Sequence, residues 1–512
     1  MLIGLDLGTT TIKAATYDPA LGRVGAVAAR PTPVSHPQPG YSEHVPEALW
    51  AAVGDCLREV LAHDPGQAVA GLAIASFAEA GLPLDGEMQP LYPIIAWYDR
   101  RCEPQAAWWD TQFSDAELHS ITGQQSSPSF GVNKWLWIRE NRPDVARRTV
   151  KWLSAADYIL YRLSGEQATD YSIASRTQMF DQRRLDWSAE ILRRAGLSAE
   201  QLPRARPAGS LVGRVTRAAA RLSGVPEGTP CVLGGHDHLC ASFAAGAYQP
   251  GMVVDSSGTA EAVAVALPAF QTSAALAQAS YACYAHVAPG QYVLKGGLKL
   301  AGGAVDWLAR LLAGLEAQLP YEQLLARAES GVGRRAGPLW LPHWLGSGTP
   351  EGDRHSLAAL VGVRAEHDQG DVFRGLLESL AFWLRHNLEE MQRLSGQTTG
   401  PVAVIGGTIR LGLLTQLKAD VLNRPVSVPE LPEGAAIGAA LLAGLGTGLF
   451  GDPAEAIGSL RYGKTEVTPD PAHVAWYDTL YRESYLPLYA ALRGVNEGLG
   501  KLQGGKRRYG AG

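Results

Sequence analysis

The chain has 512 residues, of which 46% are hydrophobic and 19% are charged, and its formal net charge at pH 7 is -5. This length exceeds one ordinary hydrophobic core, so two large domains are expected. The composition suits a soluble enzyme with extensive buried surface. The net negative charge supplies no basic field for a phosphate backbone, which argues against nucleic acid as a partner.

Cysteine usage and hydropathy bear on the compartment. The five cysteines are widely spaced and form no CxxC pair, which favours neither a disulfide framework nor a zinc knuckle. The stretch from Met1 to Asp6 lacks a basic region and contains a charge, so we do not expect a signal peptide. The longest weakly polar stretch, Ala435 to Leu445, is shorter than the roughly 20 residues of a membrane span. We therefore expect a cytoplasmic protein without a membrane partner.

The N-terminal segment predicts two strands joined by a tight turn, at residues 2–7 and 11–17. A helix is predicted after Pro46, because apolar residues recur at helical spacing from Leu49 to Leu61 and proline is tolerated in a first turn. A short buried strand is expected at residues 72–75. Helical and strand patterns then alternate, as they do in a mixed α/β domain.

The pattern restarts near residue 246. Residues 253–265 again predict a strand, a glycine turn and a strand. Within them, the sequence DSSGT at 255–259 echoes DLGTT at 6–10. Each of these two segments opens one half of the chain, which suggests two domains of similar construction.

A long amphipathic helix is predicted from Val372 to about Leu394, with Gly396 as its stop. A strand follows at residues 402–405, and the next predicted helix carries Gln416 and Asp420. No low-complexity linker separates the halves, so we expect them to pack around a shared cleft. The expected boundaries are a first domain at 1–245, a second at 246–490 and a flexible tail at 491–512.

The first candidate for phosphate binding is the turn formed by Gly8, Thr9 and Thr10. Glycine lets the backbone approach a polyphosphate, and successive N–H groups together with threonine hydroxyls can bind anions. Asp6, at the end of the preceding strand, could hold Mg²⁺ directly or through water. An ordinary hairpin turn with a solvent-facing aspartate is the alternative.

A second candidate turn, formed by Ser257, Gly258 and Thr259, repeats this arrangement. One phosphate clamp in each domain is what an NTPase with an interdomain cleft requires. The sequence contains no GxxxxGK[ST] motif, which disfavours a P-loop enzyme.

Asp237 lies in the segment GGHDH at 234–238. An aspartate just past a glycine pair at a strand end can reach into a cleft and accept a proton from a substrate hydroxyl. His236 and His238 would share one face of a strand, so an HxH metal site is an alternative. No second cluster of histidines and carboxylates at ligand spacing supports that alternative, and a purely structural aspartate is also open.

Glu79 and Trp97 each follow a predicted strand. A carboxylate accepts hydrogen bonds from paired sugar hydroxyls, and an indole packs on the C–H faces of a sugar. With Asp237, these are the predicted substrate-binding residues. A surface salt bridge beside a core tryptophan is the alternative.

In their order along the chain, these motifs resemble those of the FGGY carbohydrate kinase family. The resemblance covers nearly the whole chain and is carried by GLDLGTT at 4–10, TDYSIASRT at 169–177, GHD at 235–237, GG at 406–407 and EGAAIGAA at 433–440. It implies a two-domain actin/hexokinase-like (ribonuclease H-like) α/β fold with an interdomain cleft. The sugar would lie in the N-terminal domain, and ATP would be held mostly by the C-terminal domain.

The resemblance also implies the reaction, which is ATP-dependent phosphorylation of a hydroxyl of a small sugar or polyol. Asp237 would be the general base, and Asp6 would help to place Mg²⁺. Glu79 and Trp97 fall on positions that contact the substrate in glycerol kinases. The expected ATP- and phosphate-binding residues are Gly8, Thr9, Thr10, Ser257, Gly258, Thr259, Gly302, Gly406 and Gly407. Dimers are common among such kinases, although no apolar stripe here identifies an interface.

Four departures from the family pattern leave alternatives open. Ala78 and Ser129 stand where glycerol kinases carry Arg and Tyr, so the sugar is not fixed. Leu357 and Leu411 stand where many members have Arg and Asn. These two keep open a nucleotide-binding scaffold or regulator on the same fold. A metal-dependent hydrolase that uses the histidines beside Asp237 is the other alternative.

Overall fold

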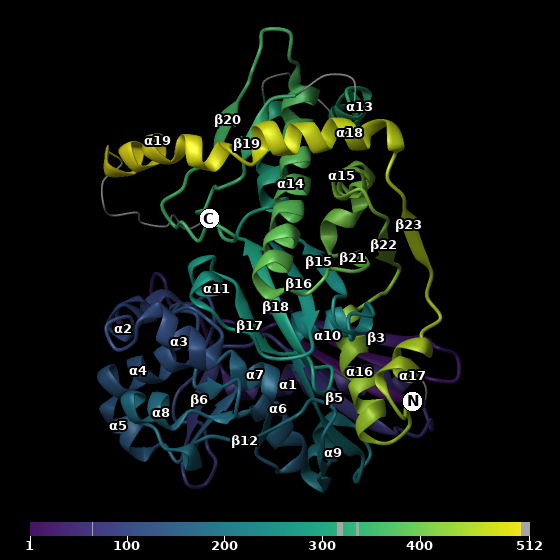
Figure 1. Ribbon diagram of the computed structural model, residues 1–512. Coiled ribbons are helices and arrows are strands. Elements are labelled where there is room, and N and C mark those ends of the chain that lie inside the picture. Colours follow the sequence, from purple (N-terminus) through teal and green to yellow (C-terminus); the bar gives the residue numbers. More distant parts are fainter. Residues whose placement is uncertain (64, 315–320, 334–336, 503–512) are drawn as a thin grey trace.

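The computed structural model describes residues 1–63, 65–314, 321–333 and 337–502. Figure 1 shows two α/β halves stacked on one another, with the N-terminal residues in the lower half and the green segments in the upper half. Each half is organised around its own sheet, which confirms the expected two-domain α/β architecture.

The sheet of the lower half has six strands in the order β13-β14-β5-β1-β2-β3. Its strands are β1 (Leu2–Leu7), β2 (Thr11–Asp18), β3 (Arg23–Pro31), β5 (Gly71–Ser76), β13 (Leu211–Arg214) and β14 (Pro230–His236). β1, β5 and β14 run parallel, whereas β2 and β3 continue the sheet in antiparallel fashion. Every residue of β1 except Asp6 is buried, because helices cover both faces of the sheet.

The sheet of the upper half has seven strands in the order β17-β18-β16-β15-β21-β22-β23. Its strands are β15 (Val253–Ser257), β16 (Glu261–Leu267), β17 (Ala282–Ala285), β18 (Tyr292–Leu298), β21 (Val402–Ile405), β22 (Val426–Pro429) and β23 (Lys464–Val467). The run β18-β16-β15-β21-β22 repeats the pairing directions of β3-β2-β1-β5-β14. The short sequence echo therefore marks topologically equivalent hairpins.

Shorter strands complete the sheet structure. Four of them form a small sheet in the lower half: β4 (Glu43–His44), β7 (Ile94–Ile95), β6 (Gly81–Leu84) and β8 (Lys151–Ser154). The two-stranded pairs are β9 (Ala168–Asp170) with β12 (Arg204–Arg206), β10 (Phe180–Asp181) with β11 (Asp186–Trp187), and β19 (Leu339–Leu341) with β20 (Ala359–Val361).

The two strongest helix predictions are confirmed. The helix after Pro46 is α1 (Pro46–His63), which packs on β2 and β3. The long helix is α14 (Gln369–Ser395), which begins three residues before the predicted start because Asp368 caps it, and ends at Gly396 with φ 70°. Its apolar side chains are buried in the upper core, so tertiary packing adds to its intrinsic preference.

The other helices occupy three groups. Those of the lower half are α2 (Glu103–Trp109), α3 (Asp115–Thr122), α4 (Gly131–Asn141), α5 (Pro143–Arg148), α6 (Ala155–Ser164), α7 (Tyr171–Ser175), α8 (Ala189–Ala195) and α9 (Arg217–Ser223). Those of the upper half are α11 (Ala274–Gln278), α12 (Gly302–Ala313), α13 (Tyr321–Ser330), α15 (Gly412–Leu422), α18 (Pro471–Leu480) and α19 (Leu488–Leu502). Near the junction lie α10 (Asp237–Ala244), α16 (Gly434–Gly446) and α17 (Pro453–Gly458).

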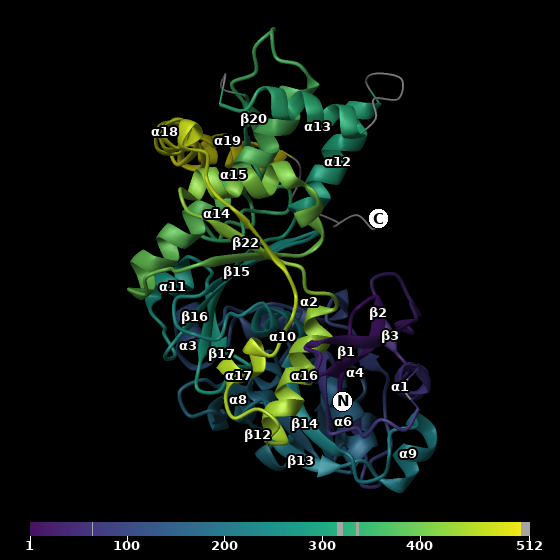
Figure 2. The ribbon, with the colours of Figure 1, turned by 90° about the vertical axis from the view of Figure 1, so that its right-hand side faces the viewer.

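Helix α16 follows the upper sheet in sequence but packs on β1, β5 and β14 of the lower one (Figure 2). The contact is close, because a Cβ on Gly4 would collide with the carbonyl oxygen of Ala436. α16 also packs on α10, where a Cβ on Gly438 would collide with the carbonyl oxygen of Cys240. Glycines at these positions allow backbone-to-backbone packing.

The C-terminal region departs from the expectation of a flexible tail from residue 491. Residues 491–502 are helical and belong to α19. The remainder of that expected tail lies outside the described residues. In the described part of the chain, no helix combines the length and the apolar character needed to cross a membrane.

Candidate active site

The first predicted phosphate turn joins β1 to β2. Its backbone is held by Thr32, whose hydroxyl donates to the carbonyl of Gly8 at 2.6 Å and whose N–H donates to the carbonyl of Thr10 at 2.9 Å. The hydroxyl of Thr9 accepts a hydrogen bond from Nε1 of Trp97 at 2.9 Å. The structure thus brings a predicted sugar-binding residue to a predicted phosphate-binding turn.

The second predicted turn, at the end of β15, is packed by two glycine-dependent contacts. The N–H of Gly302 donates to the carbonyl of Gly258 at 2.9 Å, which places the start of α12 on the turn. Gly406 has φ 102°, and a Cβ there would overlap the carbonyl oxygen of Ser257. Gly407 follows with no atom within 4 Å of its Cβ position. The predicted residues of the upper half are therefore brought together around one turn.

A buried ion triad supports this second turn. Nζ of Lys418, on α15, lies 2.5 Å from Asp255 Oδ2 and 2.8 Å from Glu261 Oε1. Asp255 and Glu261 lie on the two strands that the turn joins. The triad therefore fixes the hairpin to α15, and Asp255 is not a counterpart of Asp6 at the site.

Asp6 lies at the end of β1 and is nearly buried. Burial is the main cause that raises the pKa of its carboxyl to about 7, and the negative charge of Asp237 adds to the effect. Lys13, which pairs with Glu433 at 2.7 Å, opposes the rise. Asp6 Oδ1 is buried and has no hydrogen-bond partner among the described residues. A hard cation would offset both the burial and the repulsion, so this oxygen suits Mg²⁺.

Asp237 follows the last residue of β14 and begins α10. Its Oδ1 accepts a hydrogen bond from the N–H of His238 at 2.6 Å and lies 3.3 Å from Nε2 of His236. Burial raises the pKa of Asp237 to about 6, against the opposing charges of Lys295 and Arg176. The carboxylate is therefore ionised at neutral pH, and its Oδ2 accepts no hydrogen bond within the described ranges.

The premise of the HxH metal site is wrong. The strand ends at His236, and His238 lies in the first turn of α10, so the two side chains do not alternate along a strand. Their rings meet edge to face with centroids 5.4 Å apart. In the part of the chain that the structure describes, no group of three or more His, Cys, Asp or Glu residues could hold a metal ion.

Glu79 lies in the loop after β5 and has φ 65°, an uncommon conformation for a residue with a side chain. Its Oε1 accepts a hydrogen bond from Nε of Arg176 at 2.6 Å, and Nη2 of the same guanidinium makes a second contact. Nη1 of Arg176 donates to Gln124 Oε1 at 2.5 Å. The guanidinium thus orients the carboxylate that we expect to receive sugar hydroxyls.

Sequence reasoning assigned no role to three residues near Glu79, which are Arg176, Tyr284 and Lys295. Arg176 was visible only as the last-but-one residue of TDYSIASRT, without an assigned role. Tyr284 and Lys295, on β17 and β18, gave no local signal, because they come to the site from the other half of the chain. The ring centroid of Tyr284 lies 5.6 Å from Cζ of Arg176 and 6.5 Å from the ring of His236.

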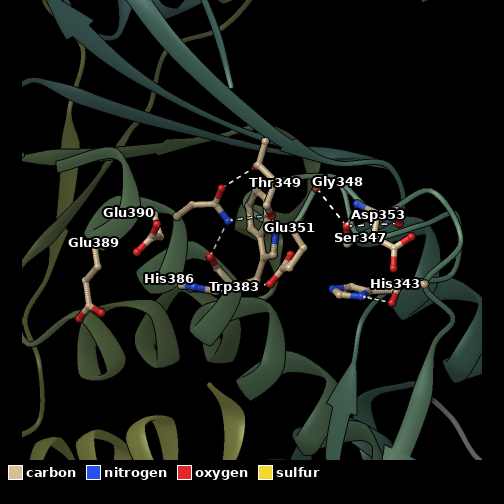
Figure 3. A network of polar contacts seen from close by, with 12 residues as sticks. His343, Ser347, Gly348, Thr349, Glu351, Asp353, Trp383, His386, Glu389 and Glu390 are labelled. Carbon is tan, nitrogen blue, oxygen red and sulfur yellow. Dashed lines mark hydrogen bonds and ion pairs between the residues drawn. The ribbon is translucent and has the colours of Figure 1, made fainter. Parts of the chain in front are cut away.

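The loop around residues 347–353, in the upper half, is anchored by Thr349 (Figure 3). The hydroxyl of Thr349 donates to Asn387 Oδ1 at 2.5 Å and accepts from the N–H of Gly297 at 3.0 Å. Nε1 of Trp383 donates to the carbonyl of Thr349 at 2.8 Å. These bonds tie the loop to both α14 and β18.

Matches of this chain to two known domains identify its family. The N-terminal domain of the FGGY family of carbohydrate kinases matches residues 1–244, and its C-terminal domain matches residues 253–447. This chain belongs to the FGGY family of carbohydrate kinases. Asp237 and Glu79 lie within the match to the N-terminal domain, and the second turn lies within the match to the C-terminal domain.

Individual members of the FGGY family are similar along nearly their full length. The chain is 28% identical to the xylulose kinase of Bacillus subtilis (strain 168) over 500 residues, which are 97% of this chain and 98% of that one. It is 31% identical to the glycerol kinase of Gloeobacter violaceus over 463 residues, 89% and 90% of the two chains. The crystal structure of xylulose kinase from Rhodospirillum rubrum matches with a TM-score of 0.89 and 30% identity, covering 97% of this chain and 99% of that one.

Proposed function

We propose that this FGGY kinase transfers the γ-phosphoryl group of ATP to a hydroxyl of a small sugar or polyol, with Asp237 as general base. The observation that best supports this role is the position of Asp237 at the start of α10. Its carboxylate is half-buried and ionised, with one oxygen held by the His238 N–H and the other without a donor among the described residues. A general base must be deprotonated and must have a free oxygen for the proton that it accepts.

The two turns are suited to the polyphosphate of ATP. The first turn, at Gly8, Thr9 and Thr10, offers backbone N–H groups and hydroxyls beside Asp6. The second, at Ser257, Gly258 and Thr259, is packed on the N-terminus of α12, where the helix dipole favours negative charge. When bound, Mg²⁺ would neutralise phosphate charge, and Asp6 is the residue whose unpartnered oxygen would hold it.

The acceptor sugar would lie between these turns and the Glu79–Arg176 pair. Oε1 of Glu79 is engaged by Arg176, and Oε2 accepts no hydrogen bond within the described ranges, so it is free for sugar hydroxyls. Trp97, whose exposed fraction is 38%, offers an indole face beside the first turn, to which its Nε1 donates. These groups position the hydroxyl, and Asp237 Oδ2 receives its proton as the new P–O bond forms.

The test is release of ADP by the wild-type protein and by Asp237→Asn against a panel of glycerol, tetritols, pentitols, ketopentoses, ketohexoses and sugar acids. We expect at least one acceptor to stimulate ADP release and Asp237→Asn to lose at least ~10²-fold in kcat, with ATP still bound. Turnover in the variant equal to that of the wild type would remove Asp237 from the mechanism. ATP binding without any acceptor-dependent turnover would favour the nucleotide-binding scaffold.

A further inference from the structure

Lys134 and Lys418 are buried and Lys295 is half-buried, and of these three lysines Lys295 alone lacks a partner among the described residues. Nζ of Lys134 donates to backbone carbonyls, including that of Pro128 at 2.9 Å. Nζ of Lys418 contacts two carboxylates in the triad described above. For Lys295, no hydrogen bond and no carboxylate oxygen within 4.0 Å is found among the described residues.

The strand pairing places Lys295 on the face that meets the active site. Lys295 is paired with Ala282, and Tyr284 with Val293, and antiparallel partners share one face of a sheet. Lys295 and Tyr284 therefore lie on the same face, the one on which Tyr284 approaches Arg176 and His236. The opposite face of β18 is turned towards α14, where Gly296 lies against Asn387.

The charges around Lys295 show that its ammonium group is not neutralised. Burial and the nearby guanidinium of Arg176 lower its pKa to about 8, although Glu79 and Asp237 act in the opposite direction. Lys418, with two carboxylates in contact, has a pKa raised above its ordinary value. Lys418 is also the more deeply buried of the two, so burial does not explain why its pKa is the higher one, whereas its direct counter-ions do. Lys295 also keeps some solvent exposure, which leaves a path for a ligand.

A second polar group on the same face as Lys295 also lacks a partner among the described residues. The hydroxyl of Tyr284 is buried and makes no hydrogen bond with any described residue. A buried hydroxyl is normally satisfied, so an unpaired one indicates a water or a ligand oxygen in the native complex. The ammonium of Lys295 and the hydroxyl of Tyr284 thus lie on one face of the sheet, and together they offer two donors that a carboxylate can accept.

We propose that Lys295 binds a carboxylate of the acceptor, so that the preferred substrate is an acyclic sugar acid rather than a neutral polyol. The proposal rests on the kinase function proposed above and adds its substrate class. The hydroxyl of Tyr284 donates a second hydrogen bond to the same carboxylate. The Glu79–Arg176 pair and Trp97 then serve the hydroxyl-bearing part of the acceptor.

The experiment compares acids with alditols of equal carbon number: D-gluconate with D-glucitol, D-xylonate with xylitol, and D-erythronate with erythritol. Initial rates of ADP release give kcat/KM for each acceptor. We expect an acid to be the best acceptor, at least ~10-fold better than its alditol, as a charged hydrogen bond allows. Lys295→Met keeps the length of the side chain and removes the charge, and it should lower kcat/KM for the acid ~10- to 100-fold. The loss with the alditol should be much smaller, because it comes only through the effect of Lys295 on Asp237.

The matched control is Lys464→Met, which removes an exposed lysine on β23 and should leave every acceptor unchanged. Calorimetric titration of the best acid reports binding without turnover, and we expect its affinity to fall only in Lys295→Met.

A neutral sugar as best acceptor, or a Lys295→Met variant that loses acid and alditol equally, would overturn the proposal but leave the kinase function standing. A rise confined to the KM for ATP would also overturn it, because it would assign Lys295 to the nucleotide. Absence of turnover and of acid binding would reject both proposals.

Discussion

Nε1 of Trp97 and the hydroxyl of Thr9 are joined by a hydrogen bond of 2.9 Å. Trp97 is placed by the loop after β7, whereas Thr9 belongs to the turn between β1 and β2. The bond links the indole that we expect beside the sugar to the turn that we expect beside the phosphates. We therefore expect sugar binding and the placement of the phosphate turn to be coupled through this one side chain.

Trp97→Phe should separate these two roles. Phenylalanine keeps an aromatic face for the sugar but cannot donate to Thr9. We expect the KM for the acceptor to change less than fivefold and kcat to fall ~5- to 10-fold, since one neutral hydrogen bond contributes about 1 kcal/mol. Steady-state kinetics with the acceptor found in the panel measures both constants. Trp476→Phe, on α18 with an exposed fraction of 37%, is the control and should change neither.

The pKa of Asp237 predicts the acid side of the pH profile. A carboxyl whose pKa is raised to about 6 is protonated, and inactive as a base, below pH 6. At saturating Mg²⁺ we expect kcat/KM to fall about tenfold per pH unit below 6 and to level off above it. Residual activity of Asp237→Asn should lose this dependence. A profile with the same acid limb in both proteins would assign that limb to another group.

The buried triad predicts a large loss of stability on removal of its cation. Lys418→Ala would leave Asp255 and Glu261 buried together without a counter-charge, so we expect the free energy of unfolding to fall by about 3–5 kcal/mol. Urea unfolding followed by far-ultraviolet circular dichroism measures it. Arg493→Ala, which removes an exposed pair with Glu497 on α19, should cost less than about 1 kcal/mol. Similar losses in the two variants would contradict the role of the triad.

Gly4→Ala tests the contact between β1 and α16. A methyl group at Gly4 would displace the backbone of α16 at Ala436, and overpacking of this kind costs about 1–3 kcal/mol. Gly494→Ala is the control, because α19 leaves open space there and alanine favours a helix by up to about 1 kcal/mol. Opposite shifts of the melting temperature in the two variants are the expected result. An unchanged Gly4→Ala protein would show that α16 can move away at no cost.

Much of the fold could be predicted from the sequence because its signals are local. The hairpin around Gly8, the helix after Pro46 and the stop of α14 at Gly396 each depend on residues that are neighbours in the chain. The placement of α16 on the lower sheet could not be predicted. It is determined by contact of Gly4 with a residue more than 400 positions away, and no periodicity records such a contact.

The candidate site likewise contains residues that the sequence predicts and residues that it does not. Glu79 and Asp237 were found because each follows a strand, where side chains reach a cleft. Arg176 orients Glu79 through an ion pair that the sequence alone does not reveal. Lys295 lies in a glycine-rich strand whose pattern predicts only a strand. The role that we propose for Lys295 depends on its having no partner among the described residues.

Because α16 packs on the sheet of the lower half, that sheet receives one of its covering helices late during synthesis on the ribosome. The last parallel strand of that sheet is complete at His236, but the helix that covers its face begins only at Gly434. At ~5–20 residues per second, translation of the intervening stretch takes roughly 10–40 s. Throughout that interval the apolar face formed by β1, β5 and β14 is uncovered, and it is the surface on the nascent chain that we expect chaperones to occupy.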